Sequence, residues 1–451
     1  MMTAAAGGEN AGIIARMLIC PGAFIRFPLK GWLRRSDLPL YEERSGLVRY
    51  LENSAFKTSL PKRGEYLKES ASGSIDSSKN ADRYDISLIL KCTRRCNLAC
   101  DYCTSHRSGP NTDFGLELLS NIFYHISTDP GIQTPRFIWH GGEPLVLGID
   151  FFKKVLFLQN RLLTDKKVCN VLQTNATLLT HEWASYLKEH NFNIGVSLDG
   201  PPEVHNKHRR LATGGDTFTA AMRGIKILKE HNFQFGILTV VTPDLIDLGP
   251  HALFDFYRKE DIKNFGLLSL RHTNASLDEF VLYKQQYEKF MTSFLRLWLE
   301  VDDTSWRLRE FESKLDAFFG LPHRLCKDGG PCVGNFFGIE PDGSISHCDK
   351  FTNDSRFVLG NVLEHSFEDI RKSEKLSELK KLEREIRQQC GKCRWFHLCG
   401  GGCLFDSISL LNAGSTLVNN ECLEFALYEE LSKILSRSKP VLEAIKEEIE
   451  R

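Results

Sequence analysis

Apolar and polar residues follow two different periods along this chain, and each period predicts one type of element. From residue 84 onward, apolar runs of strand length are followed by segments in which apolar residues recur at helical spacing. The strand-like runs are ISLILKC, RFIWHGGEP, KVCNVLQTN, FNIGVSLDG and FQFGILTVV, and the helical segments lie near 114–127, 150–163, 180–190 and 217–231. Because strands that alternate with helices build a parallel sheet, we expect an α/β fold here.

A short internal repeat supports this pattern. The hexapeptide LKEHNF occurs at 187–192 and again at 228–233, and each copy ends a predicted helix and enters a predicted strand. The spacing suits one strand–helix unit of a barrel, and a series of right-handed crossovers closes naturally into one. We therefore predict a partial (β/α)6 barrel of the TIM type.

The segments outside this region differ in composition, which predicts four units. Residues 275–320 are helical with Phe-rich faces, whereas residues 322–422 combine Cys, Gly and short strands with one charged helix, KSEKLSELKKLEREIRQQ, expected to be a solvated face. The predicted units are an N-terminal module with a Ser-rich linker (1–83), serving peptide docking or capping, the barrel (84–265), a helical connector (266–321) and a Cys-rich domain with a terminal helix (322–451).

Composition excludes several classes of protein and directs attention to cysteine. The chain has 451 residues, of which 42% are hydrophobic, and its 58 Lys+Arg balance 58 Asp+Glu. Zero net charge argues against a nucleic-acid or membrane-surface partner, and no apolar run is long enough for a membrane span. The N-terminus lacks the basic start of a signal peptide. We therefore expect a cytoplasmic protein whose 14 cysteines bind metal rather than form disulfides.

The stretch CTRRCNLACDYC contains the first group of cysteines. Cys96, Cys100 and Cys103 form a C-x3-C-x2-C triplet in the loop after the first predicted strand. Cys92 cannot begin such a triplet, because no cysteine follows it at the required spacing, so we expect a plain thiol there. Three thiolates leave one iron of a 4Fe–4S cluster open for chemistry. The alternative is a zinc knuckle with His106 as a fourth ligand.

Motifs at the ends of the following strands point to one family. GGEP follows the second strand, QTNATLL the third and SLDGP the fourth, so their polar groups face one rim of the expected barrel. Together with the triplet, these motifs resemble the radical S-adenosylmethionine (SAM) enzymes. The resemblance implies that the triplet holds a 4Fe–4S cluster whose open iron takes the amino and carboxylate groups of SAM. It also implies that Glu143 accepts a hydrogen bond from the SAM ammonium.

The same resemblance assigns further residues to SAM. Polar side chains on the third and fourth strands would line the ribose and the methionyl carboxylate. Arg209 would pair with that carboxylate or be an ordinary surface arginine, and Val240 would pack on adenine or belong to the strand core. The expected SAM-binding residues are Tyr102, Gly141, Gly142, Glu143, Pro144, Gln173, Asn175, Ser197, Asp199, Arg209 and Val240.

The second group of cysteines resembles the SPASM extension of radical SAM maturases. Seven cysteines match the pattern of that extension, and Cys326 supplies an eighth. The resemblance implies two further 4Fe–4S clusters with closed ligand shells, which favours electron transfer; a pair of zinc sites is the alternative. One cluster would take Cys326, Cys332, Cys348 and Cys403, and the other Cys390, Cys393, Cys399 and Cys422, leaving Cys20, Cys92 and Cys169 outside.

The resemblance implies a maturase that uses SAM and three 4Fe–4S clusters, with a flavodoxin- or ferredoxin-type electron donor. The TSHRSGP segment after Cys103 lacks the aromatic pair of sulfatase maturases. That difference favours oxidative cross-linking of a ribosomally made peptide, and formylglycine formation in a sulfatase is the alternative. By the same resemblance Asp349 is the base that deprotonates the substrate, although it could be structural. A zinc-binding protein without catalysis and a pure electron-transfer protein are more remote alternatives.

Overall fold

The computed structural model covers the barrel and the Cys-rich region. The expected N-terminal module, Cys20 and the TSHRSGP segment after Cys103 lie outside the described residues. The structure describes residues 84–103, 112–270, 277–301, 303–321, 323–351, 354–412, 414, 417 and 422–437.

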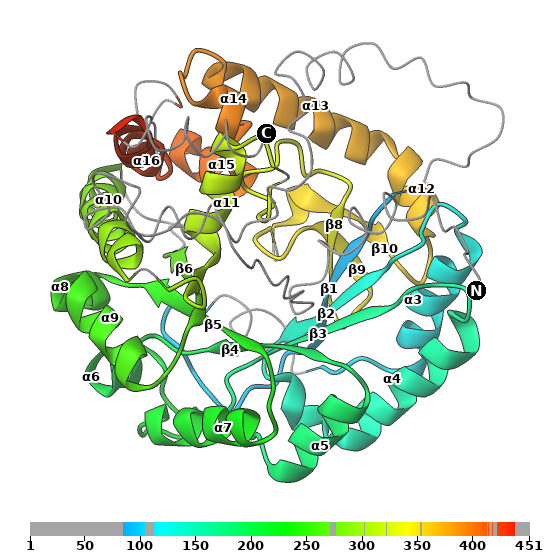
Figure 1. Cartoon of the computed structure of the whole chain (residues 1–451). Coiled ribbons are helices and arrows are strands. Elements are labelled where there is room, and N and C mark those ends of the chain that lie inside the picture. Colours follow the sequence, from blue (N-terminus) through cyan, green and yellow to red (C-terminus); the bar gives the residue numbers. More distant parts are fainter. Residues whose placement is uncertain are drawn as a thin grey trace, which may run out of the picture.

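Six parallel strands, neighbours in the order of the sequence, form the centre of the fold. Figure 1 shows them curving around the middle of the molecule with helices on the outside. The expected partial (β/α)6 barrel is therefore confirmed. The strands are β1 (Ser87–Thr93), β2 (Arg136–Gly141), β3 (Cys169–Thr174), β4 (Asn193–Ser197), β5 (Phe235–Val241) and β6 (Asn264–Ser269).

The helices that connect these strands bury one apolar face against the sheet, as their sequence period predicts. Trp139 of β2, for example, has its ring 5.6 Å from Phe152 of α4, and both side chains are fully buried. The helices are α3 (Leu116–Thr128), α4 (Ile149–Leu162), α5 (His181–Glu189), α7 (Phe218–Glu230) and α9 (Pro250–Lys259), with shorter turns η3 (Pro144–Leu147), α6 (Pro202–His208) and α8 (Pro243–Leu248).

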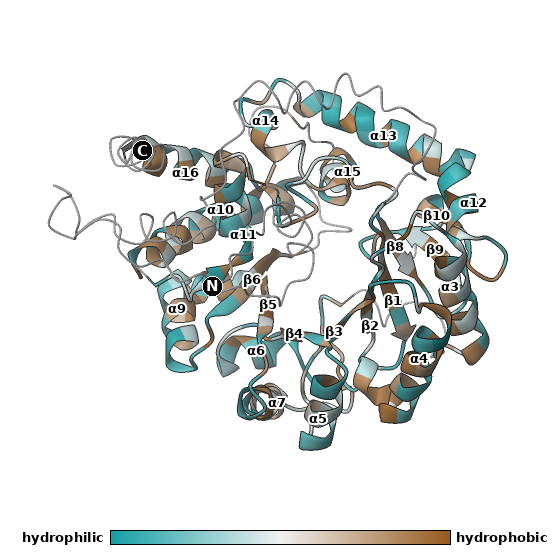
Figure 2. Ribbon diagram, turned by 45° about the vertical axis from the view of Figure 1, so that its right-hand side comes forward, coloured by the Kyte–Doolittle hydropathy of each residue, from teal (hydrophilic) through white to brown (hydrophobic). Residues whose placement is uncertain are grey.

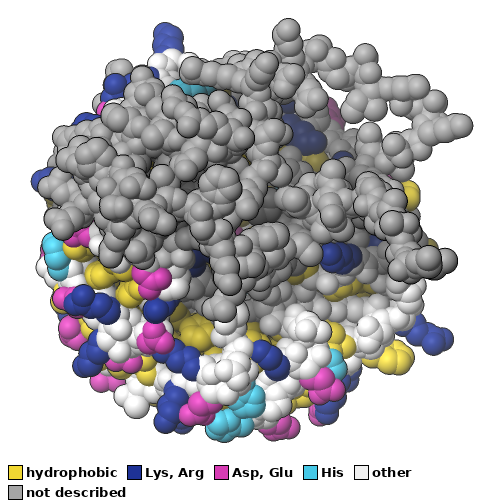
Figure 3. Space-filling model, in the orientation of Figure 1, with side chains coloured by type: hydrophobic (Ala, Val, Ile, Leu, Met, Phe, Trp, Pro, Cys, Tyr) yellow, Lys and Arg dark blue, Asp and Glu magenta, His cyan; other side chains and the backbone are white. Residues whose placement is uncertain are grey.

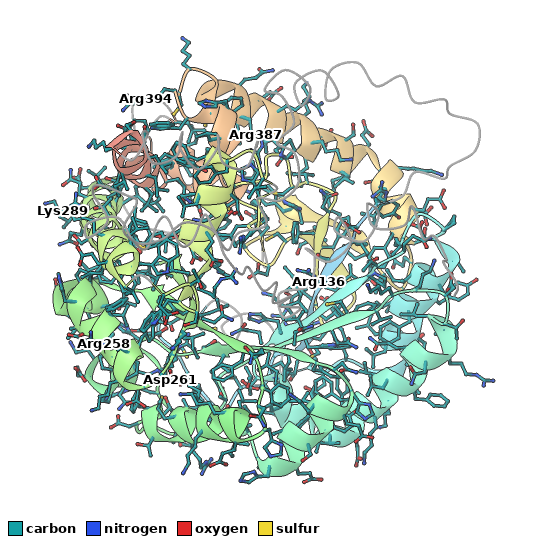
Figure 4. All side chains as sticks on the ribbon, viewed as in Figure 1. Arg136, Arg258, Asp261, Lys289, Arg387 and Arg394 are labelled. Atoms are coloured by element: carbon teal, nitrogen blue, oxygen red, sulfur yellow. The ribbon has the colours of Figure 1, made fainter. Side chains whose placement is uncertain are left out.

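The repeated hexapeptide has a structural reason. After α5 and α7, Asn191 and Asn232 adopt φ of 54° and 53°, the left-handed conformation that ends a helix. Asp261, labelled in Figure 4, does the same after α9 with φ of 46°. In each case the next amide closes back on the helix, as in the hydrogen bond of 3.0 Å from Phe192 N to Leu187 O. One helix stop is thus used three times before a strand.

The connector inserts a charged helix between the barrel and the Cys-rich region. It consists of α10 (Leu277–Glu300), the two-residue strand β7 (Arg307–Leu308) beside β6, and α11 (Arg309–Phe318). β6 extends past residue 265, so the predicted end of the barrel falls inside a strand. On α11, the side chains of Glu310, Glu312 and Lys314 are buried, which the Phe-rich pattern did not predict.

The Cys-rich region joins the barrel sheet directly. β8 (Phe336–Ile339) pairs in parallel with β1, and β9 (Ser344–His347) and β10 (Val358–Asn361) continue the sheet antiparallel. The boundary predicted at 321/322 therefore separates two parts of one ten-stranded sheet. The remaining elements, yellow to red in Figure 1, are η4 (Ser355–Phe357), α12 (Phe367–Lys372), α13 (Glu374–Cys390), α14 (Phe396–Cys399), α15 (Leu404–Asn412) and α16 (Phe425–Arg437).

The charged helix α13 is more than the solvated face expected from its sequence. Figure 2 shows it as largely hydrophilic. Glu383 and Arg387 are nevertheless buried, with 2% and 6% of their surfaces exposed. This part of the expectation was wrong. The two side chains face backbone groups of the cysteine loops, and buried backbone groups need hydrogen-bond partners.

The described part of the surface carries charges of both signs. In Figure 3, Lys and Arg side chains alternate with Asp and Glu over the described part of the visible face. Among the described helices, none combines the length and apolar character that crossing a membrane requires.

Gly224 lies where α7 packs closely against the loop after β3, so a substitution there tests this packing. A Cβ at Gly224 would lie 2.1 Å from the carbonyl oxygen of Ala176, in the loop after β3. We expect Gly224→Ala to lower the free energy of unfolding by about 1–3 kcal/mol, since overpacking a close contact has that effect. Gly115→Ala is the control, because no atom lies within 4 Å and φ is −80°. Denaturant unfolding followed by circular dichroism gives the comparison; equal midpoints for both variants would contradict it.

Candidate active site and auxiliary cluster sites

The cysteine triplet lies in a loop that leaves the end of β1 and is fixed by backbone hydrogen bonds. The segment that follows α6 runs beside it: Ala99 N donates to Arg210 O at 2.8 Å, and Ala212 N donates to Asn97 O at 2.9 Å. Within the loop, Cys103 N donates to Cys100 O at 3.2 Å. The chain therefore holds the triplet as a defined turn at the carboxyl end of the sheet, where barrel sites lie.

The three thiols of the triplet lie close enough to influence one another. Burial raises the pKa of Cys96 to about 12, and the charges of Glu143, Cys100 and Cys103 add to the rise. Burial likewise raises the pKa of Cys100 to about 11, with Arg209 opposing and Cys103 adding. Three neighbouring thiolates repel one another unless a cation lies between them. The donor set therefore fits an iron–sulfur cluster, whose irons bind thiolates.

Cys92 has a different environment. Its side chain is fully buried within β1, and its thiol donates to His140 O of β2 at 3.4 Å. Burial raises the pKa of this thiol, so it remains protonated. The side chain belongs to the core between sheet and helices, as expected for a plain thiol at a strand end.

The two glycines of GGEP allow β2 to pass directly against the cysteine loop. A Cβ at Gly142 would lie 2.0 Å from Arg95 O, and a Cβ at Gly141, where φ is 118°, would lie 2.5 Å from Thr93 O. Gly142 N donates to Thr93 O at 2.7 Å, and Glu143 N donates to Arg95 O at 2.9 Å. In this structure, the glycines are therefore required by the close approach of two backbones.

Glu143 joins the loops after β2 and β3. Its carboxylate accepts hydrogen bonds from Leu145 N at 3.1 Å, Thr174 Oγ1 at 2.7 Å and Asn175 N at 2.8 Å. Burial raises the pKa of Glu143 to about 7, and these hydrogen bonds oppose the rise. The carboxylate thus holds the rim together, and its role toward the SAM ammonium stays a prediction. Pro144 begins η3 directly after it.

The polar residues of QTN make two separate contacts. Gln173 points toward β4, where its Nε2 donates to Ser197 Oγ at 3.0 Å; Gly195 leaves room, since a Cβ there would lie 2.2 Å from Gln173 Oε1. Asn175 instead donates through Nδ2 to Asn97 Oδ1 at 3.0 Å. We did not predict Asn97 from the sequence. Its position between two cysteines of the triplet, inside the C-x3-C spacing, indicates a residue of the site.

Asp199 and Arg209, both expected to contact SAM, are paired with each other. Arg209 Nε donates to Asp199 Oδ2 at 2.8 Å, and both side chains are buried. Tyr102 Oη also donates to this carboxylate, and Val240 N donates to it at 3.0 Å. Burial alone would raise the pKa of Asp199, but Arg209 and the hydrogen bonds outweigh it and lower that pKa. The four expected residues therefore meet in one cluster beside Cys100.

The eight cysteines of the C-terminal region fall into two groups by their influence on one another. Burial is the largest cause that raises the pKa of Cys348 and of Cys399; Cys326 and Cys403 add to the rise at Cys348, and Cys422 adds to it at Cys399. The first auxiliary set is Cys326, Cys332, Cys348 and Cys403, and the second auxiliary set is Cys390, Cys393, Cys399 and Cys422. The resemblance implied the same two sets, and their binding of two iron–sulfur clusters stays a prediction.

Zinc sites are the alternative that the sequence left open for these cysteines. Tetrahedral zinc with Zn–S bonds of about 2.3 Å needs sulfurs roughly 3.8 Å apart. Within the described ranges, no three His, Cys, Asp or Glu side chains are placed to hold one metal ion. His106, the fourth ligand in the zinc-knuckle alternative, lies outside the described residues.

Buried charges on α13 hold the loops that carry the auxiliary sets. Glu383 Oε1 accepts from Cys332 N at 2.8 Å. Arg387, labelled in Figure 4, donates to the carbonyl oxygens of Gly330, Gly400 and Gly402 and to Glu383. Gly400 has φ of 65°, and a Cβ there would lie 2.8 Å from the Gly330 Cα. Charge pairing and close backbone contact thus join the loops of both sets.

A second buried network links the two sets to α11. Lys314 Nζ lies 3.3 Å from Asp328 Oδ1, with both side chains fully buried, and it also pairs with Glu424. Lys327 Nζ approaches Glu424 Oε1 at 2.5 Å. Lys327 follows a cysteine of the first auxiliary set, and Glu424 lies two residues after one of the second. The network therefore fixes the distance between the two sets.

Asp349, the expected base, lies at the end of β9 beside the first auxiliary set. Cys348 has φ of 64°, an uncommon conformation for a residue with a side chain, and it turns the chain at this point. The Cys348 thiol donates to Asp349 Oδ1 at 3.4 Å. The negative charge of Asp349 raises the pKa of Cys326, so the carboxylate lies near two thiols of that set.

The triplet and the neighbouring plain thiol give a matched pair of variants. We expect Cys96→Ala to remove the iron of one cluster and to abolish deoxyadenosine formation from SAM, because the cluster loses a ligand. Cys92→Ala should keep both, at the cost of a small cavity of about 1 kcal/mol. Iron analysis and chromatography of reductant-treated protein measure the two effects. Full iron and normal deoxyadenosine formation in Cys96→Ala would contradict the assignment.

Comparisons with known proteins agree with this architecture. The Radical SAM superfamily model matches residues 90–256, and the model of an iron-sulfur cluster-binding domain, SPASM, matches residues 331–394. A cysteine-type anaerobic sulfatase-maturating enzyme of Clostridium perfringens is 30% identical over 331 residues, covering 70% of this chain and 88% of that protein.

Solved structures show the same similarity. Native anSMEcpe with bound AdoMet superposes with a TM-score of 0.67 at 27% identity, covering 81% of this chain and 100% of that chain. The same protein with bound AdoMet and Cp18Cys peptide has a TM-score of 0.66 at 28% identity, covering 81% and 99%. The chain therefore belongs to the radical SAM enzymes with a C-terminal SPASM domain that modify a peptide or protein, the family that includes the anaerobic sulfatase-maturating enzymes.

Proposed function

We propose that this protein oxidises a cysteine or serine side chain of a sulfatase-type peptide to formylglycine. The observation that carries the proposal is the match to a maturase solved with AdoMet and a cysteine-containing peptide, which spans nearly all of that chain. The sequence favoured cross-linking of a ribosomally made peptide and kept formylglycine formation as the alternative. The relatives support the alternative, so we reverse that order.

The cofactors fit the donor groups present in the chain. We propose SAM at the rim formed by the triplet, GGEP and the QTN loop, one 4Fe–4S cluster on the triplet and one on each auxiliary set. When bound, they supply the one-electron chemistry: reductive cleavage of SAM to a 5′-deoxyadenosyl radical, and uptake of the electron that the substrate later releases. A flavodoxin- or ferredoxin-type donor would provide the first electron.

The side chains of this protein position the reactants and accept the proton that the substrate releases. Formylglycine formation removes two hydrogens from the substrate side chain: one leaves as an atom, and the other leaves as a proton together with one electron. Asp349 is the carboxylate proposed to take that proton, since it lies beside the first auxiliary set, which would take the electron. For a cysteine substrate, water then replaces sulfur and hydrogen sulfide is released.

Within the site, the cluster of Tyr102, Asp199, Arg209 and Val240 supports the SAM rim. Arg209 keeps its Asp199 partner, and the ring of Tyr102 lies 5.4 Å from the guanidinium carbon. We propose that Gln173 and Ser197, joined by a hydrogen bond between β3 and β4, orient the ribose and carboxylate end of SAM.

Cross-linking of a ribosomally made peptide remains the second candidate. The segment after Cys103 lacks the aromatic pair typical of sulfatase maturases, and this observation favours a different substrate. The proposed docking or capping role of residues 1–83 would serve either substrate.

Two peptides offered in parallel test the function. The reconstituted protein, SAM and reductant would receive a sulfatase-type peptide with Cys or Ser in its motif, and a short peptide encoded beside the gene. We expect an aldehyde on the sulfatase peptide, detected by mass spectrometry after reaction with a hydrazide. Loss of two hydrogens from the neighbouring peptide alone, without an aldehyde, would establish cross-linking instead.

Replacing Asp349 tests the proposed base. We expect Asp349→Asn to reduce peptide turnover by about 10²-fold or more, because a positioned base contributes on that order, while uncoupled deoxyadenosine formation persists. Asp342→Asn is the matched control in the turn before β9, where the carboxylate of Asp342 accepts from Ser344 N at 2.9 Å. Peptide product and deoxyadenosine are quantified in the same reactions. An equal loss of both in Asp349→Asn would count against its role as base.

A further inference from the structure

A lysine ammonium lies directly against one ligand thiol of the first auxiliary set. Lys350 Nζ donates to Cys403 Sγ at 3.4 Å and to Asp406 Oδ1 at 2.9 Å. It also lies 5.6 Å from the centre of the Phe405 ring. Asp406 and Phe405 both belong to α15, which begins just after Cys403. One helix end and one cysteine thus fix the position of the ammonium.

The geometry of the preceding residues brings Lys350 to this place. β9 ends at His347, and the left-handed conformation of Cys348, with φ of 64°, reverses the chain direction. Lys350 follows two residues later, so the same turn that presents a ligand of the set also directs the lysine toward another. The side chains of Lys350 and Asp406 are 25% and 28% exposed, so the pair is partly shielded from water.

The charge of Lys350 acts on more than one thiol of the set. Burial raises the pKa of Cys326, and Lys350 is the largest opposing influence on it. Burial and Asp406 raise the pKa of Cys403, and Lys350 again opposes them. The ammonium of Lys350 therefore lies near two sulfurs of the first auxiliary set, and the carboxylate of Asp406 lies near one of them.

We propose that Lys350 is a positioning residue that raises the reduction potential of the auxiliary cluster on the first set. Reduction adds negative charge to a cluster, and hydrogen bonds to its sulfurs or a nearby cation stabilise that charge. Asp406 holds the ammonium against Cys403 and lowers the potential by its own charge. This inference rests on the proposed cluster at this set and concerns how readily it accepts an electron.

The test measures potentials rather than turnover. The full chain carrying Cys96→Ala, Cys100→Ala and Cys103→Ala lacks the SAM cluster, so only auxiliary signals remain in an anaerobic redox titration followed by electron paramagnetic resonance. In that background, Lys350→Met should move the midpoint of one auxiliary cluster to a more negative potential and leave the other in place. Lys350→Arg should stay close to the parent, because it keeps the charge.

Asp406→Asn separates charge from packing. It removes the negative charge and retains a side chain of the same size, whose amide oxygen still accepts from Lys350 and keeps the ammonium in place, so the same midpoint should move to a more positive potential. Lys153→Met is the matched control, since Lys153 also pairs with an aspartate at 2.9 Å, but on α4 of the outer layer. Its midpoints should equal those of the parent.

Several outcomes would overturn the inference. An unchanged midpoint in iron-loaded Lys350→Met would do so, as would shifts of the same sign in Lys350→Met and Asp406→Asn. If Lys350→Met loses iron, Asp406→Asn becomes the deciding variant. An unchanged midpoint potential in Asp406→Asn would then overturn the inference. Auxiliary signals that are absent after full reconstitution would overturn both this inference and the proposed clusters. A protein that shows the predicted shifts but makes no formylglycine would support this inference and refute only the proposed function.

Discussion

The rest of this structure depends on the pairing of buried charges on α11. Glu310 accepts the Leu267 amide of β6, and Lys314 bridges Asp328 and Glu424 beside the two auxiliary sets. A buried charge without a partner is costly, so each of these side chains requires its neighbour at a defined place. The helix therefore holds the barrel and the cluster loops in one fixed relation. That relation matters for the proposed function, in which the substrate gives up an electron and a proton at the first auxiliary set.

β1 is the second constraint, because the SAM rim and the Cys-rich region both attach to it. β2 pairs on one side and β8 on the other, and the cysteine triplet follows at its end. Glu340, just after β8, reaches Arg94 of the cysteine loop at 2.8 Å. The loop is thus held by GGEP from the barrel and by an ion pair from the Cys-rich region. This explains why two basic residues occur beside the triplet: Arg94 pairs with Glu340, and Arg95 pairs with Asp113 at 2.6 Å.

The residues of the site have different roles: some hold the rim in place, and others lie beside the first auxiliary set. Glu143, Asp199 and Arg209 make hydrogen bonds within the protein that hold the loops of the rim together. Such support precedes catalysis, since reactive groups must be held precisely by residues that are themselves fixed. Asp349 and Lys350 adjoin thiols of the first auxiliary set with charges of opposite sign. The proposed base and the lysine proposed to raise the potential of the electron acceptor are therefore consecutive residues after Cys348.

The sequence by itself determined the barrel and the cysteine triplet, because periodic apolar positions and the C-x3-C-x2-C spacing are local properties of a chain. The division of the other eight cysteines into two auxiliary sets came from the family resemblance. The sequence also located the rim motifs, since strand ends of a parallel sheet meet at one edge. Only the tertiary structure decided that Asp199 and Arg209 pair with each other, that Glu383 and Arg387 of a charged helix are buried, and that β8 extends the barrel sheet. These features arise from partners distant in sequence, and the cost of an unpaired buried charge selects them only when the chain is folded.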